Sequence, residues 1–129
     1  MKNILILILT ILPFISFGQN LKCCESEKEV EKYLSGKWKE KNDESNTVYE
    51  YWFEKGKGHL SEIEIAENGD ELIELDIQPF VEIIKYNNGF KIKFTYPNEN
   101  WVSELKYLNS NKLILMTDGK ETEYYKYEK

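Results

Sequence analysis

The sequence predicts an all-β protein: an antiparallel, up-and-down meander of eight or nine short strands that closes into a barrel, with a short N-terminal helix. Apolar and polar residues alternate with a period of two over most of the chain beyond Gly36. Tight-turn dipeptides separate these runs at Asn68-Gly69, Asn88-Gly89 and Asp118-Gly119. No segment is long enough for the helical crossover that parallel strands require. Closure would remove exposed strand edges, and a two-sheet sandwich is the alternative that the sequence leaves open.

The N-terminal segment has the organisation of a secretory signal peptide. A short positively charged stretch precedes the apolar run 4–12, which Pro13 interrupts. The small residues Ser16 and Gly18 stand where a signal peptidase needs them. A transmembrane anchor is disfavoured because spanning takes roughly 20 apolar residues. We therefore expect residues 1–18 to be removed, the protein to be secreted or periplasmic, and no membrane span to remain.

Both cysteines of the chain are adjacent, at Cys23 and Cys24. Lipidation is disfavoured because the charged Lys22 precedes Cys23, where a lipoprotein signal needs a small residue. The pair could form a vicinal disulfide, cross-link two chains or stay reduced in a mobile arm. We expect the domain to fold without a structural disulfide. The lone His59 lies too far along the chain to give the thiols a zinc-type ligand spacing.

Length and charge restrict the class of partner. Removal of residues 1–18 from 129 leaves 111 residues, enough for one domain. All 17 basic residues are lysines, against 23 acidic residues, and the net charge of the full chain is −6. A protein with this net charge and no arginine lacks the cationic surface that binds nucleic-acid phosphates or anionic lipid. Nucleic acid is therefore not an expected partner.

Residues 19–35 are expected to form an N-terminal arm and one short helix. Ser26 and Glu29 have the spacing of a capping box at the start of that helix. An apolar stripe follows at helical spacing, made of Val30, Tyr33 and Leu34. Gly36 is expected to end the helix. A helix this short needs a surface to pack against.

Residues 36–129 are expected to form the barrel, with its first strand opening at Gly36-x-Trp38. The further predicted strands are 48–54, 60–66, 72–77, 81–86, 90–96, 101–108, 113–117 and 122–127. Alternation places several aromatic residues on shared faces, as in the set Tyr49, Tyr51 and Phe53 and the set Phe90, Ile92, Phe94 and Tyr96. In the strand 60–66, Ile63 and Ile65 are expected to face inward and Glu62 and Glu64 outward.

A signal peptide, a short helix and Gly36-x-Trp38 opening an antiparallel meander resemble the lipocalin-like proteins of the calycin group, and most of all the small bacterial lipocalin-like domains. Residues 53–58 resemble the end of their second strand, and residues 105–125 resemble their final hairpins. The resemblance implies that Trp38 closes the barrel floor. Those proteins pack an arginine of the last strand across the tryptophan, whereas this chain offers Lys126, which stacks more weakly without a planar guanidinium. Gly36, Trp38 and Lys126 are thus the expected closure residues.

The chain is rich in aromatic residues, at 14% with nine tyrosines, which suggests a binding site inside the barrel. The favoured interpretation is that these rings fill a narrow interior, as in other small barrels, because a chain this short can enclose little space. The expected ligand-binding residues are Tyr49, Tyr51, Phe53, Phe94, Tyr96 and Trp101.

No catalytic constellation is expected. Acidic residues with period-two spacing are interpreted as solvated strand faces, and these are Glu62, Glu64, Glu71, Glu74 and Asp76. Asn68-Gly69-Asp70 lacks the remaining ligands of a calcium loop. His59 has no nucleophile in a recognisable setting. We therefore expect neither catalytic residues, nor a metal site, nor a cofactor.

The sequence predicts a secreted or periplasmic, non-enzymatic binding protein for a small apolar or amphipathic ligand. The alternative is a protein-interaction module with a packed barrel, no internal ligand and an unidentified protein as its partner. An enclosed volume of several hundred Å³ would distinguish a ligand carrier from a packed module.

Overall fold

The fold is that of a computed structural model, which describes residues 23–55, 57–73 and 78–128. The expected signal peptide at 1–18 and the arm up to residue 22 lie outside the described residues, and so do residues 74–77 of the predicted strand 72–77.

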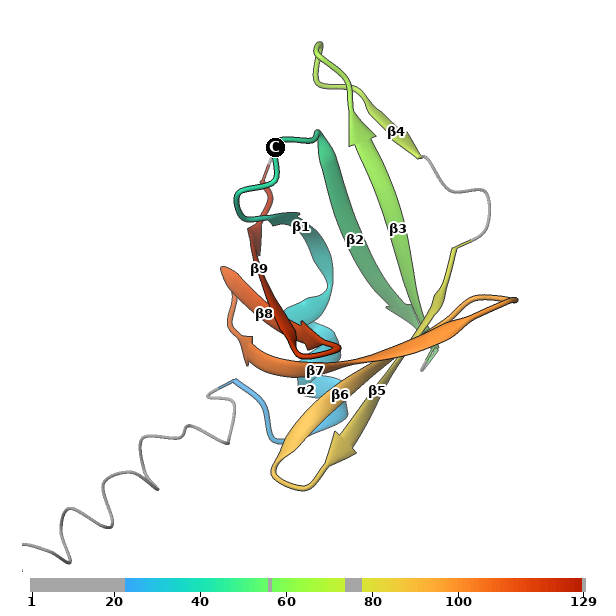
Figure 1. Cartoon of the computed structure of the whole chain (residues 1–129), viewed down its shortest axis with the longest axis vertical. Coiled ribbons are helices and arrows are strands. Elements are labelled where there is room, and N and C mark those ends of the chain that lie inside the picture. The colour runs from blue at the N-terminus through green and yellow to red at the C-terminus, as the bar shows by residue number, and fades with distance from the viewer. Residues whose placement is uncertain (1–22, 56, 74–77, 129) are drawn as a thin grey trace, which may run out of the picture.

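One short helix precedes nine strands in the described part of the chain (Figure 1). The helix is α2, Glu27–Leu34. The strands are β1 (Gly36–Glu40), β2 (Thr47–Glu54), β3 (Lys57–Ile65), β4 (Glu71–Ile73), β5 (Phe80–Tyr86), β6 (Gly89–Thr95), β7 (Asn100–Leu108), β8 (Lys112–Thr117) and β9 (Lys120–Lys126).

Eight of these strands close into an antiparallel barrel. The pairing order is β2-β1-β9-β8-β7-β6-β5-β3, and β2 pairs again with β3 to complete the circle. β4 is an additional strand on the edge of β3, and Lys37 of β1 forms an ion pair with Glu71 of β4. The predicted closed meander is therefore confirmed, and the two-sheet sandwich is excluded.

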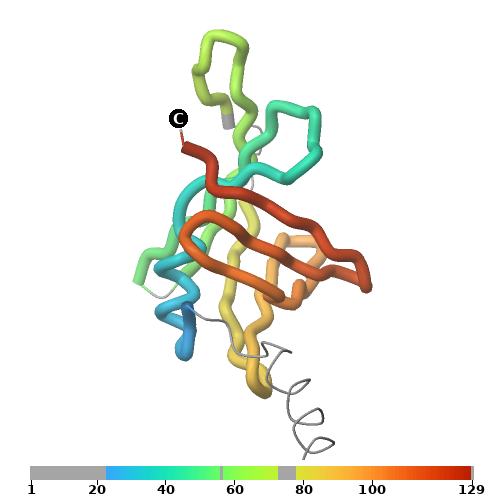
Figure 2. The backbone as a smooth tube through the Cα atoms, turned by 90° about the vertical axis from the view of Figure 1, so that its left-hand side faces the viewer, coloured from blue at the N-terminus to red at the C-terminus, as the bar shows by residue number. Residues whose placement is uncertain are grey.

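The barrel has two distinct ends. The β1–β2 loop (41–46) and the β3–β4 turn (66–70) lie at one end, which we call the loop end (Figures 1 and 2). Helix α2 and the β5–β6 turn (87–88) lie at the opposite end, which we call the helix end.

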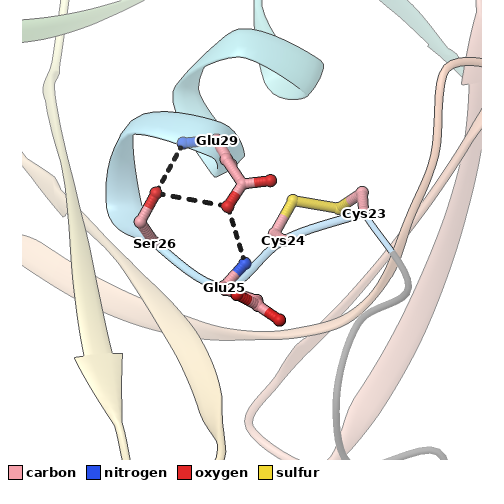
Figure 3. The surroundings of a disulfide bond; sticks show 5 residues. All are labelled: Cys23, Cys24, Glu25, Ser26 and Glu29. Carbon is pink, nitrogen blue, oxygen red and sulfur yellow. Dashed lines mark hydrogen bonds between the residues drawn. A yellow bond between two sulfur atoms is a disulfide. The ribbon is translucent and has the colours of Figure 1, made fainter.

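The start of α2 is fixed by side-chain caps, as the sequence predicts (Figure 3). The backbone N–H of Glu29 donates to the Ser26 hydroxyl at 3.3 Å. The Glu29 carboxylate accepts from the backbone N–H of Glu25 at 3.1 Å, one residue earlier than an ideal capping box. The helix ends at Leu34 with Ser35 as its cap, and Gly36, at φ +118°, opens β1.

The predicted turns are confirmed in place but not always in length. Asp118 and Gly119 form a two-residue turn with φ of 52° and 79°. The β5–β6 turn is shifted by one residue, because Tyr86 pairs with Gly89 and leaves Asn87 and Asn88 as the turn. Asn87 adopts a φ of 51°, which asparagine tolerates. The connection around Asn68-Gly69 spans the five residues 66–70 instead of two.

The core fills the barrel from the helix end. Val30 and Leu34 of α2 are fully buried against strand residues of the barrel. Cys24 is buried in the same core and forms a disulfide with the half-buried Cys23 (Figure 3). Of the three alternatives for the cysteines, the structure has the vicinal disulfide. Because Cys24 packs in the core and is bonded to Cys23, the structure does not have the alternative of reduced thiols in a mobile arm.

Candidate functional site

The helix end of the barrel is built around Trp38. This residue lies in the middle of β1 and is fully buried. Its indole Nε1–H donates to the backbone oxygen of Leu34 at 2.7 Å, which joins the first strand to the last turn of α2. A buried indole is expected to find such a partner, because leaving its N–H unpaired is costly.

Lys126 and Gly36 complete this end. Lys126 lies directly opposite Trp38 in the β1–β9 ladder, and its Nζ stands 4.3 Å from the centroid of the Trp38 ring. The same Nζ donates to the backbone oxygen of Ser35 at 2.7 Å. Burial lowers the pKa of Lys126. Gly36 has a φ of +118°, which residues with a side chain rarely adopt, and a Cβ here would approach Lys126 Nζ to 2.9 Å, so glycine suits this position.

Four of the six expected ligand-binding residues form a continuous run of rings inside the barrel. Phe94 stacks on Trp101 at 5.0 Å between ring centroids and 14° between planes. The ring centroid of Tyr96 lies 5.5 Å from that of Trp101, and the ring centroid of Tyr51 lies 6.4 Å from that of Phe94. Phe94 and Tyr51 are buried in the core, whereas Trp101 and Tyr96 are half-buried toward the loop end. The run therefore leads from the core to the loop end of the barrel.

Tyr49 and Phe53 lie on either side of this run. Tyr49 packs against the core and meets Tyr124 of β9 edge-on at 6.0 Å. Phe53 packs against the core near the helix end of β2, where a Cβ on Gly58 would approach its ring to 2.6 Å. Phe53 is thus separated from the loop-end group of rings.

Tyr124 is not among the site residues that the sequence predicts. Two adjacent tyrosines, Tyr124 and Tyr125, leave the inward position of β9 ambiguous in the sequence. Lys126 shows which tyrosine faces inward, because it lies over Trp38 inside the barrel and side chains two residues apart in a strand share a face. Tyr124 therefore faces inward with Lys126, and Tyr125 is exposed.

The hydroxyl of Tyr51 ends an otherwise buried side chain. Tyr51 is only 4% exposed, and within the described residues its hydroxyl makes no hydrogen bond. The pKa of the Tyr51 phenol is raised well above 10.0, mainly by burial and to a lesser extent by the nearby Tyr124 and Tyr49. Ser103, which is equally buried, shows the usual arrangement, since its hydroxyl bonds to that of Thr117 at 2.5 Å. Among the described residues no fully buried side-chain polar atom lacks a partner, so the Tyr51 hydroxyl still reaches accessible space.

Two carboxylates share the inner face with these phenols. Glu40 lies directly opposite Tyr124, and Glu62 lies directly opposite Tyr49. Directly paired residues of neighbouring strands point to the same side of the sheet. The pKa of Tyr124 is raised by burial and then by Glu40. The pKa of Tyr96 is raised by burial and then by Glu62.

The inward position of Glu62 corrects the orientation expected for β3. The alternation in the sequence predicts Ile63 inward and Glu62 outward. Ile63 is indeed buried, but it pairs with the fully buried Val48 outside the main core cluster. Buried residues therefore lie on both faces of the β2–β3 pair near Ile63. For this reason the more apolar face of the strand is not the face that points into the barrel. The same register puts Glu64 on the inner face, at an exposed position opposite Thr47.

The outer wall carries a second aromatic group. His59 of β3 stacks on Trp52 of β2 at 5.1 Å and meets Phe80 of β5 at 5.5 Å. Phe80 is 57% exposed and borders a surface hollow of about 310 Å³ together with Lys57 and Glu82. The single histidine is thus part of an outward-facing ring stack.

In the part of the chain that the structure describes, no three histidine, cysteine or acidic side chains are grouped to hold a metal ion. No helix among residues 23–55, 57–73 and 78–128 has the length and apolar character needed to cross a membrane.

Comparison with known proteins gives one structural likeness. No protein-family model matches the sequence, and no curated protein is similar to it. A solved lipocalin-like protein from Bacteroides uniformis ATCC 8492 is similar over 74% of this chain and 99% of that chain. The sequence identity is 17% and the TM-score is 0.45.

The topology itself decides the class of fold. Eight antiparallel strands follow one another around the barrel in chain order, and β1 pairs with β9 to bring the two ends of the meander together. This up-and-down closure of eight strands is the arrangement of lipocalins. The fold is lipocalin-like. A lipocalin-like barrel generally serves non-enzymatic binding, with the ligand taken at the mouth of the barrel.

Proposed function

We propose that this chain is an exported, non-enzymatic binding protein that takes a small apolar or amphipathic ligand at the loop end of its lipocalin-like barrel. The observation that carries the proposal is the Tyr51 hydroxyl, which ends an almost fully buried side chain, makes no hydrogen bond within the described residues and still reaches accessible space. A hydroxyl in this position can bond to water or to a polar group of a ligand, a partner that the chain itself does not supply. The half-buried rings of Trp101 and Tyr96 supply apolar contact area beside it.

The helix end supports the same direction of entry. We propose that Gly36, Trp38 and Lys126 close the barrel there, since Trp38 is sealed under α2 and Lys126 lies across its ring. A ligand would then enter from the loop end and meet Trp101 before it reached Tyr51.

Export is the first part of the proposal to test. The charged start, the apolar run and Ser16-x-Gly18 lead us to expect a mature chain that begins at Gln19. Intact-mass measurement of the protein from its native host checks this. A mass increase of lipid size on Cys23 or Cys24, or retention of residues 1–18, would contradict the prediction.

Ligand entry from the loop end predicts which tryptophan reports binding. N-phenyl-1-naphthylamine, a neutral apolar fluorophore, is expected to bind saturably and quench Trp101, which is half-buried, while Trp38 stays unaffected behind the core. Trp101→Phe should therefore abolish most of the quenching. Trp52→Phe, on the outer wall, is the matched control and should leave the quenching in place.

A second candidate function is favoured by the outer wall. The stack of Trp52, His59 and the exposed Phe80 offers aromatic area of the kind enriched at protein interfaces. The protein would then be an interaction module with a packed barrel and no internal ligand. Absence of saturable probe binding, or quenching that disappears in Trp52→Phe and survives in Trp101→Phe, would favour this alternative.

A further inference from the structure

The loop end of the barrel interior carries negative charge without a matching positive charge. Glu40 and Glu62 are half-buried on the inner face, opposite Tyr124 and Tyr49. Over the described residues, neither carboxylate takes part in a salt bridge. Charge held near an apolar interior is unfavourable unless a partner compensates it. A positively charged group would compensate both carboxylates.

Aromatic rings surround these carboxylates. Tyr124 and Tyr49 stand edge-to-face at 6.0 Å, and Tyr124 lies within electrostatic reach of Glu40. On the other side, Tyr96 lies against Trp101 and within electrostatic reach of Glu62. The faces of tyrosine and tryptophan rings attract cations, and ammonium groups are recognised by sets of such rings. Rings and carboxylates therefore favour the same sign of charge.

The Tyr51 hydroxyl, which ends a nearly buried side chain, reaches accessible space and makes no hydrogen bond within the described residues, is an independent polar contact for a ligand at this position. Its phenol lies near those of Tyr124 and Tyr49, whose proximity contributes to its raised pKa. A tyrosine hydroxyl both donates and accepts hydrogen bonds, so it can accept from an N–H group or donate to a polar group of the ligand.

The lysines on the inner face, Lys85, Lys120 and Lys126, do not supply the missing charge. Lys85 donates to the backbone oxygen of Glu25 at the helix end. Lys126 is held at the helix end, where its Nζ donates to Ser35 and lies over Trp38. Lys120 shares the inner face by its register with Thr117, but it is exposed at the β8–β9 turn. An anionic ligand such as a fatty-acid carboxylate would meet Glu40 and Glu62 without a counter-charge, which disfavours it.

We propose that the ligand is an amphipathic organic cation, an amine or quaternary ammonium compound with an apolar tail. Its charged head lies among the residues of what we call the mouth cluster, and its tail lies along the stacked rings toward Phe94. The inference rests on the proposed binding function and specifies its ligand class. The mouth cluster consists of Glu40, Tyr49, Glu62, Tyr96, Trp101 and Tyr124.

Three probes with the same tail and different heads test the inference. Octyltrimethylammonium, 1-octanol and octanoate are titrated by calorimetry into the protein as its own host exports it. Octyltrimethylammonium is expected to bind roughly tenfold more tightly than 1-octanol, an effect between the cation–π contributions of an exposed and of a desolvated site. Octanoate is expected to bind most weakly, because it brings a like charge toward Glu40 and Glu62.

The carboxylates are then removed without change of shape. Glu40→Gln and Glu62→Gln, singly and together, should lower the affinity for octyltrimethylammonium toward that for 1-octanol. Glu121→Gln is the matched control, since Glu121 lies opposite Met116 on the outer face and is exposed.

The outcomes separate the two levels of the proposal. If no probe binds, both the binding function and the ligand class are wrong. If all three probes bind equally, or octanoate binds most tightly, the binding function stands and the cationic ligand is wrong. A preference for ammonium that survives in the double variant would also overturn the proposed role of the mouth cluster.

Discussion

Trp38→Ala is expected to lower the free energy of unfolding by about 3–5 kcal/mol, the usual cost of deleting a fully buried large aromatic side chain. Three effects of the substitution act together. The ring leaves a cavity beneath α2, the backbone oxygen of Leu34 loses its indole donor, and the ammonium of Lys126 loses the ring that it lies over. The midpoint of urea unfolding, at unchanged slope, measures the loss.

Two variants show whether the position of Trp38 is responsible. Trp38→Phe keeps an aromatic ring but removes the indole N–H, so it should cost less than Trp38→Ala. Trp52→Ala removes a tryptophan of the half-exposed outer wall and should also cost clearly less. Equal losses for Trp38→Ala and Trp52→Ala would contradict the proposed closing role of Trp38.

The fold could be predicted because its signals are local. Period-two alternation and turn dipeptides define most strands, and Gly36-x-Trp38 marks where the barrel begins. The extra strand β4 was not separable from the barrel strands by pattern alone. Only its pairing distinguishes β4 from the barrel strands. β4 pairs with the loop-end part of β3, whereas the barrel strand β5 pairs with β3 nearer the helix end.

The candidate site was only partly predictable, because the interior of a closed barrel depends on register. The aromatic residues were selected by type, and four of them do lie together. Glu62 was assigned outward because Ile63, next to it, is more apolar, and only the pairing of Glu62 with Tyr49 reveals its side. Glu40 likewise gains its place from its partner on β9, Tyr124, which is 84 positions further along the chain.

The cysteines illustrate the same limit. Adjacent cysteines in the sequence carry no information about whether they pack in the core. Cys24 does so because the segment before α2 lies against the helix end of the barrel, where Lys85 also bonds to the backbone of Glu25. That contact joins residues 60 positions apart, so no local pattern announces it.

Alkaline pH is expected to destabilise the protein from about pH 10 upward, through two buried phenols. Burial raises the pKa of Tyr51 and Tyr124 in the folded state above the ordinary value of 10.0, at which they ionise in the unfolded chain. Below pH 10 both states bind these protons and no stability is lost. Above it the unfolded state releases protons that the folded state retains. Each phenol then lowers the unfolding free energy by about 1.4 kcal/mol per pH unit.

Tyr51→Phe isolates one of these contributions. Because the Tyr51 hydroxyl makes no hydrogen bond within the described residues, its removal should leave stability at neutral pH unchanged or slightly higher. Above pH 10 the variant should lose stability less steeply than the natural chain, by about 1.4 kcal/mol per pH unit. Tyr125→Phe removes an exposed phenol and serves as the matched control. Urea unfolding at a series of pH values measures both slopes. A large loss for Tyr51→Phe at neutral pH would mean that its hydroxyl has a partner within the protein, and would remove the observation on which the binding function rests.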